Sequence, residues 1–360
     1  MVTRAMSETT TDSASMKVGV QLGIQKYGVA EMPKPKATPG MVVAKVSLAG
    51  VCGSDLHRYW HRRETQTAPD GHEMVGVVTE VGDGVTNVHP GDRVVADLIT
   101  LGRGCGVCYY CRTGNHTHCI DPNRPRISGA FSEYIHAKAA GFFRLPDNVD
   151  DRAAVLIEPL AVGVHGVRWS GMPPGSTVAV VGAGTIGLAT MLAAKAAGAS
   201  RVFITAKHPF QAAAARRLGA TEVLPIDPVA ADAVIKEATN GLGADCVFET
   251  VGGGADTFDL ACQLARPLGK VTILGVYFER SVTVDLFHPL LKEVTIYLPD
   301  CYSIIDGRHD FELAVDMSTK YAQELRSLVT HEFTLDEVEK AFHTAADKRT
   351  GSIKVLVRPG

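Results

Sequence analysis

Four cysteines stand close together in the pattern C-x2-C-x2-C-x7-C: Cys105, Cys108, Cys111 and Cys119. This spacing offers one metal ion four thiolates within a short loop, which is the ligand set of a closed tetrahedral zinc site. Such a site leaves no open position for a substrate, so it would hold a lobe over residues 103–120 in shape and perform no chemistry. The alternative is two disulfides, which require an oxidising compartment. The sequence therefore predicts a structural zinc ion here and places the chemistry elsewhere.

A second set of metal-binding residue types is spread along the chain. Cys52 lies in the turn Gly50–Asp55, and His72 and Glu73 follow Gly71. A lone cysteine or histidine is more often a core or surface residue. What favours a metal here is that the two occur together in a chain that also carries a glycine segment of the nucleotide-binding type. Glu158 lies in an apolar stretch, where a carboxylate is costly unless it is paired or bound. Together these residues predict a zinc site with an open position.

A glycine-rich segment, Gly182-Ala183-Gly184-Thr185-Ile186-Gly187, directly follows a short apolar run and opens a stretch rich in Ala and Leu. Gly182 would allow the tight turn, Gly184 would let the backbone approach a pyrophosphate, and Gly187 would permit close packing of helix on strand. The helix N-terminus would face the anion. A glycine turn with a purely structural role is the alternative. In this context the segment predicts a dinucleotide-binding site.

The end of the next predicted strand carries Ala206 and Lys207, where dinucleotide-binding folds usually have an acidic residue. A carboxylate there would bind the adenosine ribose hydroxyls and repel a 2′-phosphate, whereas a lysine would attract that phosphate. The sequence therefore favours NADP, with NAD as the alternative coenzyme. Lys207 as a solvated loop residue with no such role is the other interpretation.

Bulk properties limit the classes of function. The chain has 360 residues with 46% hydrophobic residues and a formal net charge of -3, enough for two domains and without reason to expect nucleic acid or an anionic membrane as partner. No apolar run is long enough to span a bilayer. Residues 1–15 are predicted to be a disordered leader rather than a signal peptide, with Met16 as a candidate start. We expect a cytoplasmic protein.

The pattern of apolar residues divides the chain into two regions, whose secondary structure must position these residues. Residues 16–160 show short β-branched runs cut by Gly, Pro and Asp, which predict a small β-barrel or irregular sheet: Met41–Leu48, Val75–Val81, Asp92–Asp97 and Phe131–Ala137. From 161 to about 298, short apolar runs alternate with helical stretches, which predicts βαβ units and a parallel sheet: Thr177–Val181, Val202–Thr205, Glu222–Ile226, Asp245–Glu249 and Val271–Leu274. Residues 299–360 mix helices with a terminal strand and are expected to rejoin the first domain.

The accumulated motifs resemble the zinc-dependent medium-chain dehydrogenase/reductase family, in its polyol and sorbitol dehydrogenase branch. The Cys52 turn, Gly71-His72-Glu73, the turn Pro90–Val94, the four-cysteine lobe, Glu158-Pro159-Leu160 and the glycine segment occur in family order. The resemblance implies an α/β protein with a GroES-like catalytic domain and a doubly wound Rossmann domain. It also implies hydride transfer between a nicotinamide coenzyme and a small-molecule alcohol or ketone, two zinc ions per chain, and a homodimer or homotetramer.

The resemblance also implies roles for individual residues. Cys52 and His72 would be ligands of the catalytic zinc, and Glu73 a ligand that comes and goes. Glu158 stands where many alcohol dehydrogenases have a second cysteine, so it would bind the metal directly or through water.

Ser54 would bind the substrate oxygen, His57 would relay the proton to solvent, and Asp55 would orient His72. Thr250 and Val276 would contact the coenzyme, together with the glycine segment.

The chain departs from the family pattern in two places. The segment Leu298–Tyr302 lacks the Arg-Tyr pair typical of polyol dehydrogenases, which weakens any claim for sorbitol itself. Asp70 replaces a residue that is generally apolar, and with Arg62 and Arg63 nearby it makes the expected substrate entrance more polar, although solvated loop charges would explain it equally well. A conjugate double-bond reductase and a non-catalytic nucleotide-binding relative remain the competing interpretations.

Overall fold

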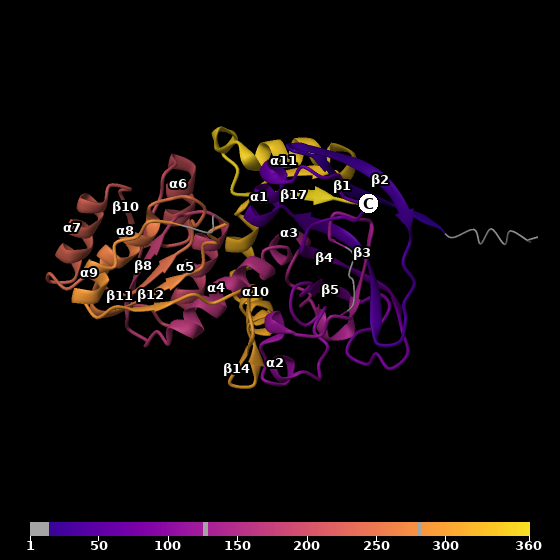
Figure 1. Ribbon diagram of the computed structural model, residues 1–360, viewed down its shortest axis with the longest axis horizontal. Coiled ribbons are helices and arrows are strands. Elements are labelled where there is room, and N and C mark those ends of the chain that lie inside the picture. The colour runs from indigo at the N-terminus through magenta and orange to yellow at the C-terminus, as the bar shows by residue number, and fades with distance from the viewer. Residues whose placement is uncertain (1–13, 125–128, 279–281) are drawn as a thin grey trace, which may run out of the picture.

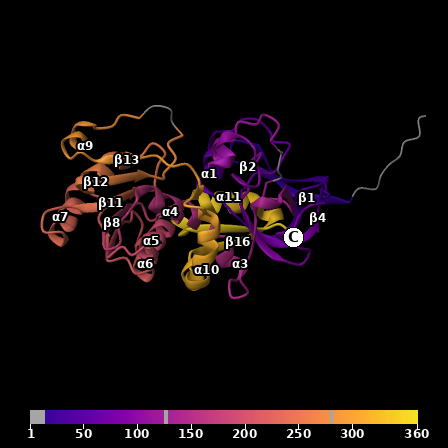
Figure 2. The ribbon, with the colours of Figure 1, turned by 90° about the horizontal axis from the view of Figure 1, so that it is seen from below.

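The structure, a computed structural model, describes residues 14–124, 129–278 and 282–360. Two lobes lie side by side, each built on its own sheet, and the C-terminus lies in the lobe that also contains the N-terminal strands (Figure 1). The view from below shows the same separation, with α4 and α10 near the junction (Figure 2). None of the described helices is long and apolar enough to cross a membrane.

The first lobe contains a seven-stranded, mainly antiparallel sheet in the order β16-β17-β3-β4-β5-β7, with β6 paired to β3. Its strands are β3 (Met41–Gly50), β4 (Glu73–Val81), β5 (Arg93–Ala96), β6 (Tyr134–Lys138), β7 (Phe142–Arg144), β16 (Val329–Thr334) and β17 (Lys354–Arg358). The last strand pairs with the first of the sheet through Leu356 and Gly50. Residues from the end of the chain therefore lie against residues near its beginning.

The second lobe contains a six-stranded parallel sheet in the order β10-β9-β8-β11-β12-β13. Its strands are β8 (Thr177–Val181), β9 (Arg201–Thr205), β10 (Glu222–Leu224), β11 (Ala244–Glu249), β12 (Ala265–Ile273) and β13 (Thr295–Tyr297). The order reverses between β8 and β11, and in doubly wound folds a ligand binds at this switch point, beyond the carboxyl ends of the strands.

Both faces of the parallel sheet are covered, which explains why β8 is apolar at every position except its first residue. Val178 and Val180 pack on the face shared with α4, α5 and α6, whereas Ala179 and Val181 pack on the face shared with α7 and α8. The helices on the two faces are α4 (Ile157–Ser170), α5 (Thr185–Ala196), α6 (Pro209–Arg217), α7 (Pro228–Ala238) and α8 (Thr257–Leu264).

The two lobes share one hydrophobic cluster at their junction. It joins residues of β3 and β4 with residues of α4, α5 and α10 (Asp310–Arg326), so that Leu48 and Leu188 belong to the same buried cluster. Because α4 packs along α5 and α10, it forms a shared wall between the lobes rather than a flexible linker. The relative position of the two sheets, and of the side chains they carry, is thereby defined.

Each of the five strands expected in the second lobe overlaps a strand of the structure, and Thr177–Val181 agrees at both ends. The edge strand β13 and helix α4 were not predicted, and β12 begins at Ala265 rather than Val271. Several elements of the first lobe were not predicted: the hairpin β1 (Ser15–Gly23) and β2 (Lys26–Pro33), and helix α1 (Gly53–His61). The predicted leader over residues 1–15 falls mostly outside the described residues, and it extends too far, because Ser15 already belongs to β1. The remaining helices are α2 (Tyr109–Arg112), α3 (Asp151–Ala154), α9 (Phe287–Leu291) and α11 (Val338–Ala346).

Candidate active site

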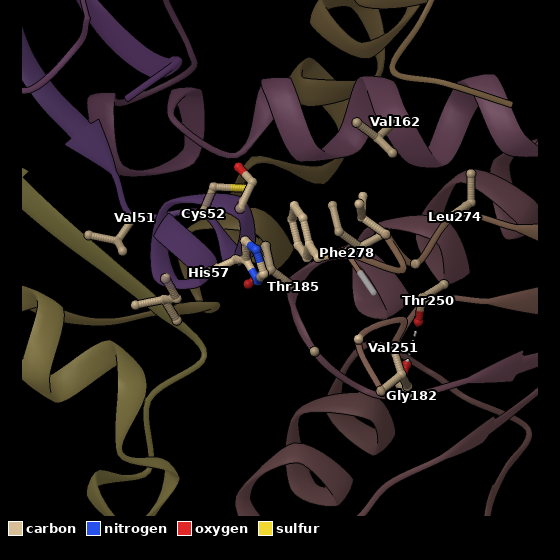
Figure 3. A pocket seen from close by; sticks show the side chains of 18 of the residues that line it. Val51, Cys52, His57, Val162, Gly182, Thr185, Thr250, Val251, Leu274 and Phe278 are labelled. Carbon is tan, nitrogen blue, oxygen red and sulfur yellow. Dashed lines mark hydrogen bonds between the residues drawn. The ribbon is translucent and has the colours of Figure 1, made fainter. Parts of the chain in front are cut away.

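A cleft of about 1860 Å³ lies between the two sheets and receives residues from both lobes. Cys52 and His57 come from the first lobe, while Phe278, Thr250 and the turn at Gly182 come from the second (Figure 3). The metal-binding residue types and the glycine segment, which were identified separately in the sequence, therefore share one cavity.

Helix α1 carries three of the expected catalytic groups. Cys52 is its N-cap residue, and the backbone N–H of Cys52 donates to the Asp55 carboxylate at 2.9 Å. Ser54 and His57 are three residues apart and therefore share one helical face, and both line the cleft. The His57 ring stacks on Phe278, with 3.7 Å between ring centroids, and Figure 3 shows the two rings next to Cys52. Burial, followed by the charges of His61 and Arg58, lowers the pKa of His57.

The side chains of Cys52, His72 and Glu73 form a compact group, in which one ligand atom of each residue lies within 4.8 Å of the others. A thiolate, an imidazole and a carboxylate at this separation fit a zinc ion. Glu158 is buried in the same cleft, although it does not belong to that group. Direct ligation by Glu158 therefore stays a prediction.

The pKa of Glu158 is nevertheless shifted by its surroundings. Burial, together with the nearby carboxylates of Glu73 and Asp97, raises its pKa to about 7, although His72 and Lys354 oppose the rise. A carboxylate in such a position gains strongly from a cation beside it, because the cation offsets the cost of burying the charge.

A buried ion pair holds Glu73 in place. The Lys354 ammonium on β17 donates to both carboxylate oxygens of Glu73, at 2.7 and 2.6 Å, and to the carbonyl of Val51 at 3.1 Å. Both side chains are almost inaccessible to solvent, Glu73 at 1% and Lys354 at 2%. Glu73 is thus shared between the metal group and a lysine from the last strand, which is consistent with a ligand that comes and goes.

A charged network connects α1 with the turn that carries His72. Arg58 pairs with the buried Asp55 and also lies 3.6 Å from Asp70, measured from Nε to the carboxylate. Asp70 in turn accepts from Arg62 at 2.9 Å and from the Tyr27 hydroxyl at 3.3 Å. The unusual Asp70 is therefore half-buried and paired rather than a solvated loop charge. Its network ties the Cys52 helix to the His72 turn.

Asp55 was expected to orient His72. The hydrogen bonds that the structure gives it run to the Cys52 backbone and to Arg58, while its charge acts on His72 across the site. The orienting role stays a prediction.

The glycine segment forms the expected strand–turn–helix. Gly182 has φ +100, a conformation that favours glycine, and Gly184 is the N-cap residue of α5. A Cβ at Gly187 would stand 1.8 Å from the carbonyl oxygen of Gly182, so only glycine fits there. Ala183, Thr185 and Ile186 also line the cleft, and the Thr185 hydroxyl donates to Ile353 of the first lobe at 3.0 Å. The N-terminus of α5 therefore faces the cleft and can accept a pyrophosphate.

Thr250 completes this turn. Its hydroxyl donates to the carbonyls of Val181 at 2.8 Å and Gly182 at 3.1 Å, the latter contact being drawn in Figure 3. Val276 is exposed within the cleft on the same side.

At the end of β9, the Thr205 hydroxyl accepts a hydrogen bond from the Gly182 N–H at 2.8 Å. Ala206 packs against the core, whereas Lys207 and His208 line the cleft. The first side chain after β9 that lines the cleft is thus a cation, Lys207.

The four-cysteine lobe is assembled as predicted. One sulfur of each of Cys105, Cys108, Cys111 and Cys119 lies within 4.8 Å of the others, and the structure contains no disulfide among the described residues. Backbone N–H groups of Val107 and Cys108 donate to the Cys105 sulfur at 3.4 and 3.3 Å. This arrangement fits a structural zinc ion.

Comparison with known proteins agrees with this geometry. Residues 38–147 match the family model of the alcohol dehydrogenase GroES-like domain, and residues 185–320 match that of zinc-binding dehydrogenases. Sorbitol dehydrogenase of Bacillus subtilis is 31% identical over 98% of this chain and 99% of its own length. The chain belongs to the zinc-dependent medium-chain dehydrogenase/reductase family. It is therefore an oxidoreductase of the alcohol and polyol dehydrogenase type, with a GroES-like domain and a Rossmann domain.

Two solved structures are similar over nearly the whole chain. A zinc-binding dehydrogenase from Sinorhizobium meliloti 1021 bound to NADP has a TM-score of 0.81 and 30% identity, covering 96% of this chain and 100% of that one. Galactitol-1-phosphate dehydrogenase from Escherichia coli has a TM-score of 0.83 and 27% identity, with the same coverage.

Each group of the site has a task in hydride transfer. When bound, zinc supplies a Lewis acid for the substrate oxygen and the nicotinamide coenzyme carries the hydride. Ser54 and His57 line the cleft on one helical face, so Ser54 would hydrogen-bond the substrate oxygen and His57 would pass a proton towards solvent. The α5 N-terminus would orient the coenzyme pyrophosphate, and Phe278 covers His57 from the second lobe.

Sequence reasoning missed Lys354 and Arg58. A usable signal existed for Lys354, because a lysine within a buried terminal strand is rarely tolerated without a partner. Arg58 had a weaker signal: Asp55 is three residues away on the same helix, a spacing at which side chains pair, whereas Asp70 meets Arg58 only through the fold.

Proposed function

We propose that this protein oxidises a secondary hydroxyl of a polar, polyol-like substrate, and reduces the corresponding ketone, with NADP as the favoured coenzyme. One observation carries the proposal: the metal group Cys52, His72 and Glu73 lies in the same cleft as the glycine turn at the N-terminus of α5. The named relatives, sorbitol dehydrogenase and galactitol-1-phosphate dehydrogenase, support a polyol. The complete donor set favours metal-assisted hydride transfer over the double-bond reductase and the non-catalytic interpretation.

The test is a panel of polyols with each coenzyme, followed by nicotinamide absorbance. We expect turnover by the zinc-loaded protein, loss of turnover on chelation, and recovery when zinc is returned. Cys52→Ser should lose turnover, whereas Cys246→Ala, in the core of the second lobe, should retain it. Turnover that survives both chelation and Cys52→Ser would contradict the proposal.

The coenzyme preference rests on the end of β9. With Ala206 packed into the core, no carboxylate at this position can bind the ribose hydroxyls, and Lys207 in the cleft can attract a 2′-phosphate. We expect kcat/KM to favour NADP by roughly tenfold to a hundredfold. Ala206→Asp with Lys207→Leu should reverse the preference, and Lys236→Leu, on an exposed helix of the same lobe, should leave it unchanged. Tighter binding of NADH than NADPH at low salt would refute the interpretation.

A homo-oligomer is supported by the free edge of the parallel sheet. β13 is the edge strand, and α9 lies beside it (Figure 2). Large exposed apolar side chains occur on and next to these elements: Leu286, Phe287, Leu290, Leu291 and Leu298. An apolar edge strand is a ready template for pairing with a second copy of the chain. Light scattering should give a dimer or tetramer, and Leu290→Glu should shift it towards the monomer; a wild-type monomer would contradict this.

A further inference from the structure

Arg103 differs from the other cationic side chains of the cleft in the partners that its guanidinium has. The described lysines and arginines that line it are Arg58, Arg103, Lys207, Lys348 and Lys354. Arg58 and Lys354 are neutralised by carboxylates, and Lys207 lies beside the coenzyme turn. The Lys348 ammonium donates to the carbonyl of Ala345 at 2.9 Å.

The guanidinium of Arg103 has unmet hydrogen-bonding capacity. Its Nε is enclosed by protein and has no acceptor among the described residues. The nearby charge that acts on it is that of Arg124, which has the same sign, and burial together with Arg124 lowers the pKa of Arg103. On open surface such a group would be solvated by water. The enclosed Nε itself is out of reach of a ligand, but Arg103 also lines the cleft, where an anion would offset its charge by accepting from the other N–H groups of the guanidinium.

The backbone holds Arg103 at this place. Asp97 directly follows β5, and its carboxylate accepts from N–H groups of the turn, including those of Thr100 at 2.7 Å and Leu101 at 2.7 Å. The Arg103 N–H donates to the Thr100 carbonyl at 3.2 Å, which continues the turn. A Cβ at Gly102 would stand 2.4 Å from the Asp97 carbonyl oxygen, so the tight turn requires glycine there. Arg103 thus sits on a turn with several hydrogen bonds, between the cleft wall and the four-cysteine lobe.

We propose that Arg103 forms an anion subsite of the active-site cleft and binds a carboxylate or phosphate group carried by the substrate. A guanidinium presents a fork of N–H donors that matches either group and binds it through paired, charge-assisted hydrogen bonds. The inference rests on the proposed function and narrows its substrate class from a polar alcohol to a polyol with one anionic end. The anionic end would anchor the substrate at Arg103 while the reacting hydroxyl lies at the metal group.

The test compares three probes that share a polyol chain: sorbitol, which is neutral, gluconate, which carries a carboxylate, and sorbitol phosphate. For the wild-type protein we expect kcat/KM for one of the anions to exceed that for sorbitol by roughly tenfold to a hundredfold, mainly through KM, and the advantage to shrink as salt is added. Arg103→Met should remove that ratio. Arg112→Met is the matched control, because Arg112 lies exposed on α2, does not line the cleft among the described residues, and should preserve the ratio.

Calorimetric titration of the same probes into the holoenzyme with NADP gives a readout that does not depend on turnover. If sorbitol is oxidised but neither anion binds or reacts better, or if Arg103→Met weakens all three probes alike, the subsite is refuted while the proposed function stands. If no probe is oxidised, the proposed function is at fault for this substrate class, and the titration still decides whether Arg103 binds an anion. The two anions distinguish a carboxylate from a phosphate subsite.

Discussion

Replacing Lys354 with methionine should destabilise the protein strongly, because the substitution leaves the Glu73 carboxylate buried without its counter-ion. The ammonium contacts both oxygens of Glu73 at 2.7 and 2.6 Å, and solvent screens neither group. Breaking one side of such a pair costs about 3–5 kcal/mol of the free energy of unfolding. For domains of this size the melting temperature should fall by on the order of 10 °C.

The assay is thermal and urea unfolding at neutral pH of protein that retains the structural zinc ion but has lost the labile one, because a zinc ion beside Glu73 would itself offset the carboxylate charge. Lys340→Met is the control, since Lys340 forms an exposed pair with Glu337 at 3.1 Å and should change stability by less than about 0.5 kcal/mol. The double variant Lys354→Met with Glu73→Gln should recover much of the loss, because no unpaired charge remains. If Lys354→Met is as stable as the control, or if the double variant is no better than the single one, the buried pair does not have the energetic role argued from its geometry.

Three further predictions concern the site. Because burial raises the pKa of Glu158 to about 7, the folded metal-free protein binds the Glu158 proton more tightly than the unfolded chain does. The free energy of unfolding should therefore fall by about 3 kcal/mol as pH rises from 4.5 to 7, and Glu158→Gln should flatten this pH dependence. Identical pH profiles of the two metal-free proteins would contradict the raised pKa. Gly187→Ala should abolish coenzyme binding in a titration, since its Cβ would meet the Gly182 carbonyl oxygen at 1.8 Å, and unaltered affinity would show that the turn is not the pyrophosphate site. Elemental analysis should find two zinc ions per chain, one retained at the four cysteines and one labile at the Cys52 group. Cys108→Ser should lose the retained ion and solubility, whereas Cys52→Ser should lose the labile ion and turnover. A single zinc ion in the fully active wild type would refute the assignment.

The sequence alone was sufficient for those features whose geometry is local. The four cysteines of the lobe lie within fifteen residues of one another, so their spacing nearly determines the tetrahedral group, as the structure confirms. The glycine turn and five of the six strands of the parallel sheet were likewise predicted, because the apolar runs and the glycine positions specify a strand–turn–helix within one short segment. The first lobe was less predictable, since the hairpin β1–β2 depends on packing against distant segments such as Ser132.

Only the tertiary structure determined the contacts between residues that are far apart in the chain. Lys354 reaches Glu73 because β17 returns to pair with β3, and Asp70 is stabilised by Arg58 because α1 packs against the His72 turn. That the Nε of Arg103 has no acceptor among the described residues is equally a property of the fold, as a sequence shows a charge but not which acceptors lie within reach. Local spacing determines turns and helices, whereas the neighbours of a buried charge depend on how the elements pack, and packing is specified by the whole set of side chains at once.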